Sequence, residues 1–168
     1  MKHKYAFWFA LPLCMGLACT PAPQEKVEED LIGYTNPMIG TDFTGNTYPG
    51  AQVPFGMVQL SPDNGLPGWD RISGYYYPDS TIAGFSHTHL SGTGAGDLYD
   101  ISFMPVTNPY KTGAEPLGIY SSFSHNDESA SAGYYRVLLK DYNINVELTA
   151  TERCGIQRYT FPEAESSI

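Results

Sequence analysis

Hydrophobic and polar residues alternate most regularly near the C-terminal end of the chain. In NINVELTAT, residues 143–151, apolar side chains stand at positions 144, 146, 148 and 150, with polar side chains between them. Successive side chains of a strand point to opposite faces, so this pattern predicts a strand with one face in the core. YYRVLLK before it and IQRYTF after it predict neighbouring strands. Turns are expected at Asp141-Tyr142-Asn143 and Cys154-Gly155, which makes this end an antiparallel meander.

Two shorter apolar runs, GMVQL at 56–60 and DISFMPV at 100–106, predict further buried strands. The stretch that follows residue 60 is dense in turn-forming PDNG, LPG and YPD sequences. We find no helical period and no internal repeat. The 17 glycines, 13 prolines and 13 tyrosines also suit short strands joined by tight turns. We therefore expect an all-β fold whose loops carry the function.

The N-terminal residues have the pattern of an export signal. Two lysines precede a short apolar stretch in residues 1–18, and Ala18 stands directly before Cys19. This order predicts a lipoprotein signal in which Cys19 is acylated, the alternative being plain cleavage near Ala18. Residues 19–30 are polar and acidic, which indicates a flexible tether. We expect an exported outer-membrane lipoprotein, periplasmic or on the cell surface, attached to the membrane through its lipid.

The charge and cysteine content narrow the classes of function. The chain carries 9 basic and 18 acidic residues, a formal charge of -9. Nucleic-acid surfaces need clustered lysine and arginine, so we expect no nucleic-acid partner. An acidic chain rich in aromatic residues better suits a neutral polar ligand such as a sugar. Only Cys154 remains beyond the leader, so the folded part can form no intrachain disulfide.

The segment GFSHTHLSGTG, residues 84–94, holds two histidines. If the segment is extended, His87 and His89 project to one face, as a pair of zinc ligands would. A third ligand is not obvious, because the remaining choices are His125 or the carboxylates Asp97 and Asp100. The alternatives are a loop that contacts a ligand and a polar network that braces the loop.

Trp69 and Asp70 form a second candidate group within a turn-rich loop. An indole can stack on the apolar face of a sugar ring while a carboxylate accepts hydrogen bonds from the hydroxyls. The alternative is that Trp69 fills the core beneath its turn. The sequence contains no phosphate-binding loop and no nucleophile elbow. Nothing in it places two carboxylates at the separation that glycoside hydrolysis requires.

Several long motifs resemble the N-terminal domain of glycoside hydrolase family 92. The resemblance covers essentially all of residues 31–168. The motifs are YTNPMIGTDFTGNTYPGAQVPFGMVQLSPD (34–63), GWDRISGYYYPDSTIAGFSHTHLSGTG (68–94), DLYDISFMPV (97–106) and GYYRVLLKDYNINVELTATERCGIQRYTFP (133–162).

That resemblance implies a fold and an activity. The family consists of calcium-dependent, inverting exo-α-mannosidases in which an antiparallel β-sandwich of the galactose-mutarotase type precedes a catalytic (α/α)6 barrel. The resemblance implies that residues 31–168 are an incomplete sandwich without the barrel, and that the barrel holds the catalytic residues and most of the calcium site. It assigns Trp69 and Asp70 to the mannose site, and the loop of His87 and His89 to the same domain boundary.

The expected function is therefore one wall of the sugar site in an exported α-mannosidase of the α-1,2 type. Its partners would be a mannose-containing glycan and the chain's own C-terminal catalytic domain. We expect the chain to be inactive by itself, because no catalytic residue is assigned to it. The alternatives are a non-catalytic surface lipoprotein that binds glycan and an inactive gene fragment.

Overall fold

The computed structural model describes residues 29–92, 98–114 and 118–163. Regular structure in these ranges consists of antiparallel strands and three short 3-10 helices, so the prediction of an all-β fold is confirmed. The elements in chain order are η1 (Leu31–Tyr34), β1 (Ala51–Gln52), β2 (Gln59–Asp63), η2 (Trp69–Arg71), β3 (Thr81–Ile82), β4 (Gly84–Ser86), β5 (Ser121–Ser122), η3 (His125–Asp127), β6 (Glu128–Ser131), β7 (Tyr134–Leu139), β8 (Ile144–Ala150) and β9 (Gly155–Thr160).

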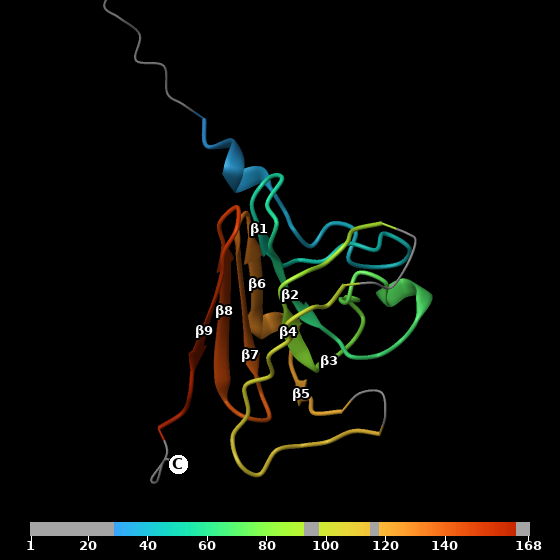
Figure 1. Ribbon diagram of the computed structural model, residues 1–168, viewed down its shortest axis with the longest axis vertical. Helices are drawn as coiled ribbons and strands as arrows, with labels where there is room; N and C mark the ends of the chain where they lie inside the picture. The colour runs from blue at the N-terminus through green and yellow to red at the C-terminus, as the bar shows by residue number, and fades with distance from the viewer. Residues whose placement is uncertain (1–28, 93–97, 115–117, 164–168) are drawn as a thin grey trace, which may run out of the picture.

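The strands form three antiparallel sheets (Figure 1). Strands β6, β7, β8 and β9 make a four-stranded meander in chain order, which confirms the predicted C-terminal hairpins. Strands β1, β2 and β4 make a second sheet, and β3 pairs with β5. The second sheet packs on the meander, because β1 and β2 both contact β8. The arrangement is that of two layers around one core.

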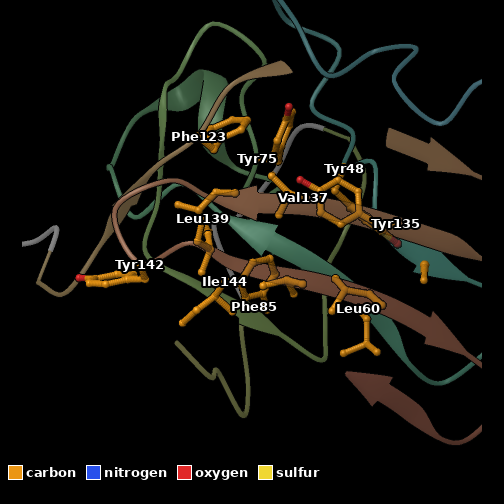
Figure 2. Packing of buried hydrophobic residues seen from close by; sticks show 14 residues of the cluster. Tyr48, Leu60, Tyr75, Phe85, Phe123, Tyr135, Val137, Leu139, Tyr142 and Ile144 are labelled. Carbon is orange, nitrogen blue, oxygen red and sulfur yellow. The ribbon is translucent and has the colours of Figure 1, made fainter. Parts of the chain in front are cut away.

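Strand β8 shows how the alternating pattern positions side chains. Ile144, Val146 and Leu148 have no exposed surface, while Glu147 between them is only half-buried. Asn143 closes the preceding turn with a φ of 51°, a conformation that asparagine tolerates better than most residues. Val137 and Leu139 of β7 lie beside this face and meet Leu60 and Phe85 of the opposite sheet (Figure 2). Complete burial of each such side chain contributes about 1.5–3 kcal/mol to folding.

Two of the predicted strands differ from the structure. Only the last two residues of the 56–60 run belong to β2, and Met57 is 71% exposed. Residues 100–106 form no strand: a single bridge joins Phe103 to Phe85, and Ile101 is 67% exposed. The positive φ of Ile101, 55°, breaks the extended conformation that a strand needs. The prediction of a buried strand at 100–106 is therefore wrong.

The predicted leader, the Cys19 lipidation site and most of the tether lie outside the described residues. Within the described ranges, no helix is long and apolar enough to span a bilayer.

Candidate functional site

Loops meet beside the three-stranded sheet and form a surface that we name the loop corner (Figure 1, right). Backbone hydrogen bonds tie these loops together: Tyr77 N donates to Thr41 O at 2.8 Å, and Gly92 N donates to Asn46 O at 2.7 Å. Four chain segments make up the loop corner: residues 40–48, 63–79, 86–92 and 98–100.

Trp69 begins η2 within the loop corner, and its side chain faces solvent. The residue is 61% exposed, so the alternative in which Trp69 fills the core is wrong. Asp70 follows in the same turn and is half-buried. Its carboxylate makes no hydrogen bond or ion pair with another residue in the described part of the chain, so its oxygens can accept hydrogen bonds from a ligand. Trp69 and Asp70 are thus consecutive residues of one short turn, the indole exposed and the carboxylate half-buried.

Arg71 holds η2 in place. Its guanidinium forms a two-pronged pair with Asp79, in which Nε donates to Oδ2 at 2.6 Å and Nη2 donates to Oδ1. The hydrogen bond to Asp79 is the main cause of the raised pKa of Arg71. The guanidinium also lies 4.8 Å from the ring centre of Tyr76, which adds a cation–π contact. A planar, two-pronged pair fixes direction as well as distance, so the turn that carries Trp69 is pre-organised.

A buried amide joins the same loop to the sheet. Asn64 accepts a hydrogen bond from Tyr76 N at 2.5 Å and donates one to Thr81 O at 2.7 Å. In the sequence, this asparagine stands out only as part of a PDNG turn. The backbone N–H of Asn64 also donates to Gly74 O at 2.8 Å, so this one residue holds the segment from Gly74 to Thr81 at both ends.

His89 is a bracing residue in this structure, because its imidazole has no exposed surface. Nδ1 lies 2.8 Å from Gln59 O, and a carbonyl can only accept, so Nδ1 is the donor. Nε2 lies 3.0 Å from Asp63 Oδ1 and 3.2 Å from Ser86 Oγ. The ring therefore joins β2 to the segment that follows β4. This is the polar network that the sequence left open as an alternative.

His87 has a different environment and is only half-buried. Its Nδ1 donates to Ile101 O at 2.9 Å, and its ring meets the edge of Phe103. In the described part of the chain Nε2 has no hydrogen-bond partner, so it is open to a ligand. Strand β4 ends at Ser86, so the extended segment that would place both imidazoles on one face is not present. The two rings contact separate sets of neighbours.

A buried carboxylate, which the sequence does not predict, lies at the start of β6. Glu128, with a side chain 1% exposed, accepts hydrogen bonds from Tyr135 Oη at 2.5 Å and from Tyr75 Oη at 3.0 Å. His125 Nδ1 lies 2.6 Å from its other oxygen, and the His125 ring stacks on Tyr77 at 3.9 Å. Burial, followed by the Glu128 charge, raises the pKa of both Tyr75 and Tyr135. No local motif signals this network, because its members come from distant segments.

The described residues do not fit a metal centre. In residues 29–92, 98–114 and 118–163, no three histidine, cysteine, aspartate or glutamate side chains gather closely enough to hold an ion. Both His89 nitrogens are occupied by protein oxygens. We therefore assign calcium to none of these residues. Asp97, one of the carboxylates considered as a ligand, lies outside the described residues.

Comparisons with known proteins agree with the fold and the motifs. The model of the glycosyl hydrolase family 92 N-terminal domain matches residues 34–168. A family GH92 α-mannosidase from Bacteroides thetaiotaomicron, solved with mannoimidazole, is 46% identical with a TM-score of 0.76. The match covers 82% of this chain and 19% of that one. A family GH92 inverting mannosidase from Bacteroides thetaiotaomicron VPI-5482 is 30% identical with a TM-score of 0.62, over 81% and 19% of the two chains.

A more distant relative comes from a fungus. An uncharacterized secreted glycosidase of Arthroderma benhamiae is 28% identical over 173 residues, which cover 96% of this chain and 22% of the relative. The chain thus spans about a fifth of the length of these three proteins. The matched residues include every element of the loop corner. The chain belongs to glycosyl hydrolase family 92, and residues 34–168 correspond to the N-terminal domain of that family.

Proposed function

We propose that this chain is the N-terminal part of an exported, inverting α-mannosidase that removes terminal mannose, of the α-1,2 type, from glycans. The loop corner supplies one wall of the sugar site. The observation that carries the proposal is the solvent-facing Trp69, held by Arg71 and Asp79 in a domain of this family. The relative solved with mannoimidazole supports mannose as the sugar. The secreted fungal relative supports export.

Four residues of the loop corner, Trp69, Asp70, His87 and His89, have a part in this proposal. The indole of Trp69 offers an apolar face to the C–H groups of the sugar ring. Asp70 accepts hydrogen bonds from ring hydroxyls, and His87 Nε2 accepts one at the edge of the site. His89 is assigned to the same site but acts from beneath it, because its buried ring holds the loop in position.

The chemistry of an inverting glycosidase needs two carboxyl groups. One protonates the leaving oxygen, and the other activates a water on the opposite face of the sugar, with about 6.5–9.5 Å between them. We assign neither group to this chain and place both on the family's catalytic domain. The contribution of the loop corner is to orient the sugar, which lowers the barrier by fixing the reacting geometry. We place calcium, an expected cofactor, in that same domain.

A chimera tests the proposal. Residues 31–168 replace the corresponding segment of the 46% identical α-mannosidase, and turnover of α-1,2-mannobiose is measured. We expect the chimera to be active and Trp69→Ala to lower kcat/KM at least about a hundredfold, because orientation is lost. The matched control is Tyr110→Ala, which removes another exposed aromatic side chain, 53% exposed, outside the loop corner.

Two results would contradict the proposal. Equal activity of the Trp69→Ala and Tyr110→Ala chimeras would remove Trp69 from the sugar site. Turnover by the 168-residue chain alone would show that it needs no catalytic domain. An inactive chimera that still binds mannose at Trp69 would favour the alternative, a glycan-binding surface lipoprotein.

A further inference from the structure

A cavity lies away from the loop corner, on the outer face of the four-stranded sheet. It has a volume of about 500 Å³ and opens where η3, the β7–β8 turn and the end of β9 meet. The opposite face of this sheet packs into the core against β1 and β2. The cavity and the loop corner are therefore on opposite sides of the core.

The register of the meander builds the floor of this cavity. Leu138 of β7, Asn145 of β8 and Thr160 of β9 are paired directly across the sheet and all line the cavity. Arg136 Nε donates to Asn145 Oδ1 at 3.1 Å, which occupies the amide oxygen and fixes the plane of the carboxamide. The NH₂ group of Asn145 has no partner among the described residues, so it is available as a donor to a ligand.

The remaining lining combines polar side chains with the apolar Phe161 and Pro162. Asn126 and Asn143 add two carboxamides at the rim, and Phe161, 52% exposed, adds an apolar face. Carboxamides both donate and accept, as do the hydroxyls of a sugar. An exposed ring beside such groups suits the C–H face of a pyranose. These two features together are typical of a carbohydrate site.

The charges of the lining favour a neutral ligand. Arg136 and Asp127 carry opposite charges, and Asp127 lies 3.4 Å from Lys140. Glu128 also lines the cavity, but its carboxylate is 1% exposed and is bound by His125 and the two tyrosines. The lining carries a formal charge of -1, one arginine against Asp127 and Glu128, and protein groups hold both carboxylates, so an anion or a cation gains little there.

We propose that this cavity binds one neutral hexopyranose unit of a glycan, at a site separate from the loop corner. Its volume is within the range of about 300–1,000 Å³ that small-ligand sites have. The proposal goes beyond the function proposed above, which places sugar at the loop corner only. A second site of this kind would hold a branched glycan at a point remote from the bond that is cleaved.

Nuclear magnetic resonance distinguishes the two sites. The ¹⁵N-labelled chain is titrated with methyl α-D-mannopyranoside, and backbone amide shifts are followed at Asn143, Asn145 and Phe161. We expect saturable shifts there, and about a tenfold weaker affinity in Asn145→Ala, because the loss of one or two hydrogen bonds costs that much. Trp69→Ala should leave these shifts unchanged.

Control variants keep the test independent of folding. Thr149→Ala changes the same face of β8 at its other end, outside the cavity, and should not alter the affinity. Phe161→Ala changes an exposed side chain and should weaken binding without altering the melting temperature. The proposal is overturned if the cavity amides do not shift with the sugar. It is also overturned if Trp69→Ala abolishes their shifts, or if sodium acetate shifts them while the sugar does not.

Discussion

At the scale of single residues, the exposure of a side chain separates those that a ligand could reach from those that brace the loops. Trp69 reaches solvent, whereas the side chain of His89 is buried, although both residues belong to motifs that predict a place in the site. The sequence predicts both as ligand-contacting residues, because that prediction depends on residue type and motif alone. Burial depends on what the rest of the chain places over a side chain, so the sequence could not separate the two.

The pair of Arg71 and Asp79 gives the first prediction. Their side chains are 23% and 9% exposed, so the pair is partly shielded from water. Asp79→Asn should lower the free energy of unfolding by about 1–2 kcal/mol and weaken mannose binding at Trp69, because the turn loses its brace. Urea denaturation and sugar titration measure the two effects.

A second ion pair serves as the control. Lys140 and Asp127 lie 3.4 Å apart with side chains 44% and 40% exposed. Asp127→Asn should change the free energy of unfolding by less than about 0.5 kcal/mol, as exposed pairs contribute little. Equal destabilisation by the two substitutions would show that Arg71 and Asp79 do not act as a brace.

At the scale of elements, the meander was predictable and the strands before it were less so. The alternation at 144–150 depends only on neighbours in sequence, and the structure follows it. Strand β6, with the sequence ESAS, carries no large apolar residue and was missed; it exists because β7 pairs with it. The 100–106 run was misassigned because Ile101 adopts a positive φ. Hydrophobicity alone does not reveal either effect.

Charged residues on the outer face of the meander predict how the stability of the fold depends on pH. Arg136, Glu147 and Arg158 are paired across β7, β8 and β9. Hydrogen bonds from Arg158, and then from Tyr134, lower the pKa of Glu147 from 4.5 to about 2. A lowered folded-state pKa contributes stability that is present above about pH 4.5 and is lost as the pH falls towards 2. Urea denaturation between pH 5 and pH 2.5 measures this loss.

The variant Glu147→Gln isolates that contribution. It should be less stable than the parent chain at pH 5, and the difference should shrink as the pH falls. Glu152→Gln, an exposed change in the turn that follows β8, is the control and should keep the parental pH dependence. A constant difference between Glu147→Gln and the parent chain across this range would contradict the assignment.

At the scale of the whole molecule, one core joins the sheets. Buried residues from β2, β4, β7 and β8 belong to a single cluster, together with Tyr75 from the loop corner (Figure 2). We therefore expect one cooperative thermal transition, with coincident midpoints for the tyrosine signal in near-ultraviolet circular dichroism and the strand signal in the far ultraviolet. Separate midpoints, or no transition, would support the inactive gene fragment.

The predicted attachment to the membrane concerns the whole molecule as well. If Cys19 is acylated after export, labelled palmitate should be incorporated into the chain expressed in a Gram-negative host, and Cys19→Ser should abolish the label. The control is Cys14→Ser, which changes another leader cysteine and should keep the label. Incorporation into the Cys19→Ser variant would contradict the predicted site.

The buried carboxylate of Glu128 connects segments that lie far apart in the chain. This one carboxylate accepts a hydrogen bond from Tyr75, which lies in the same loop-corner segment as Trp69. It also bonds to His125 of η3, whose other residues line the cavity on the outer face of the meander. Glu128 therefore acts as a single joint between η3 and the segment of Tyr75, and its loss would loosen both segments at once.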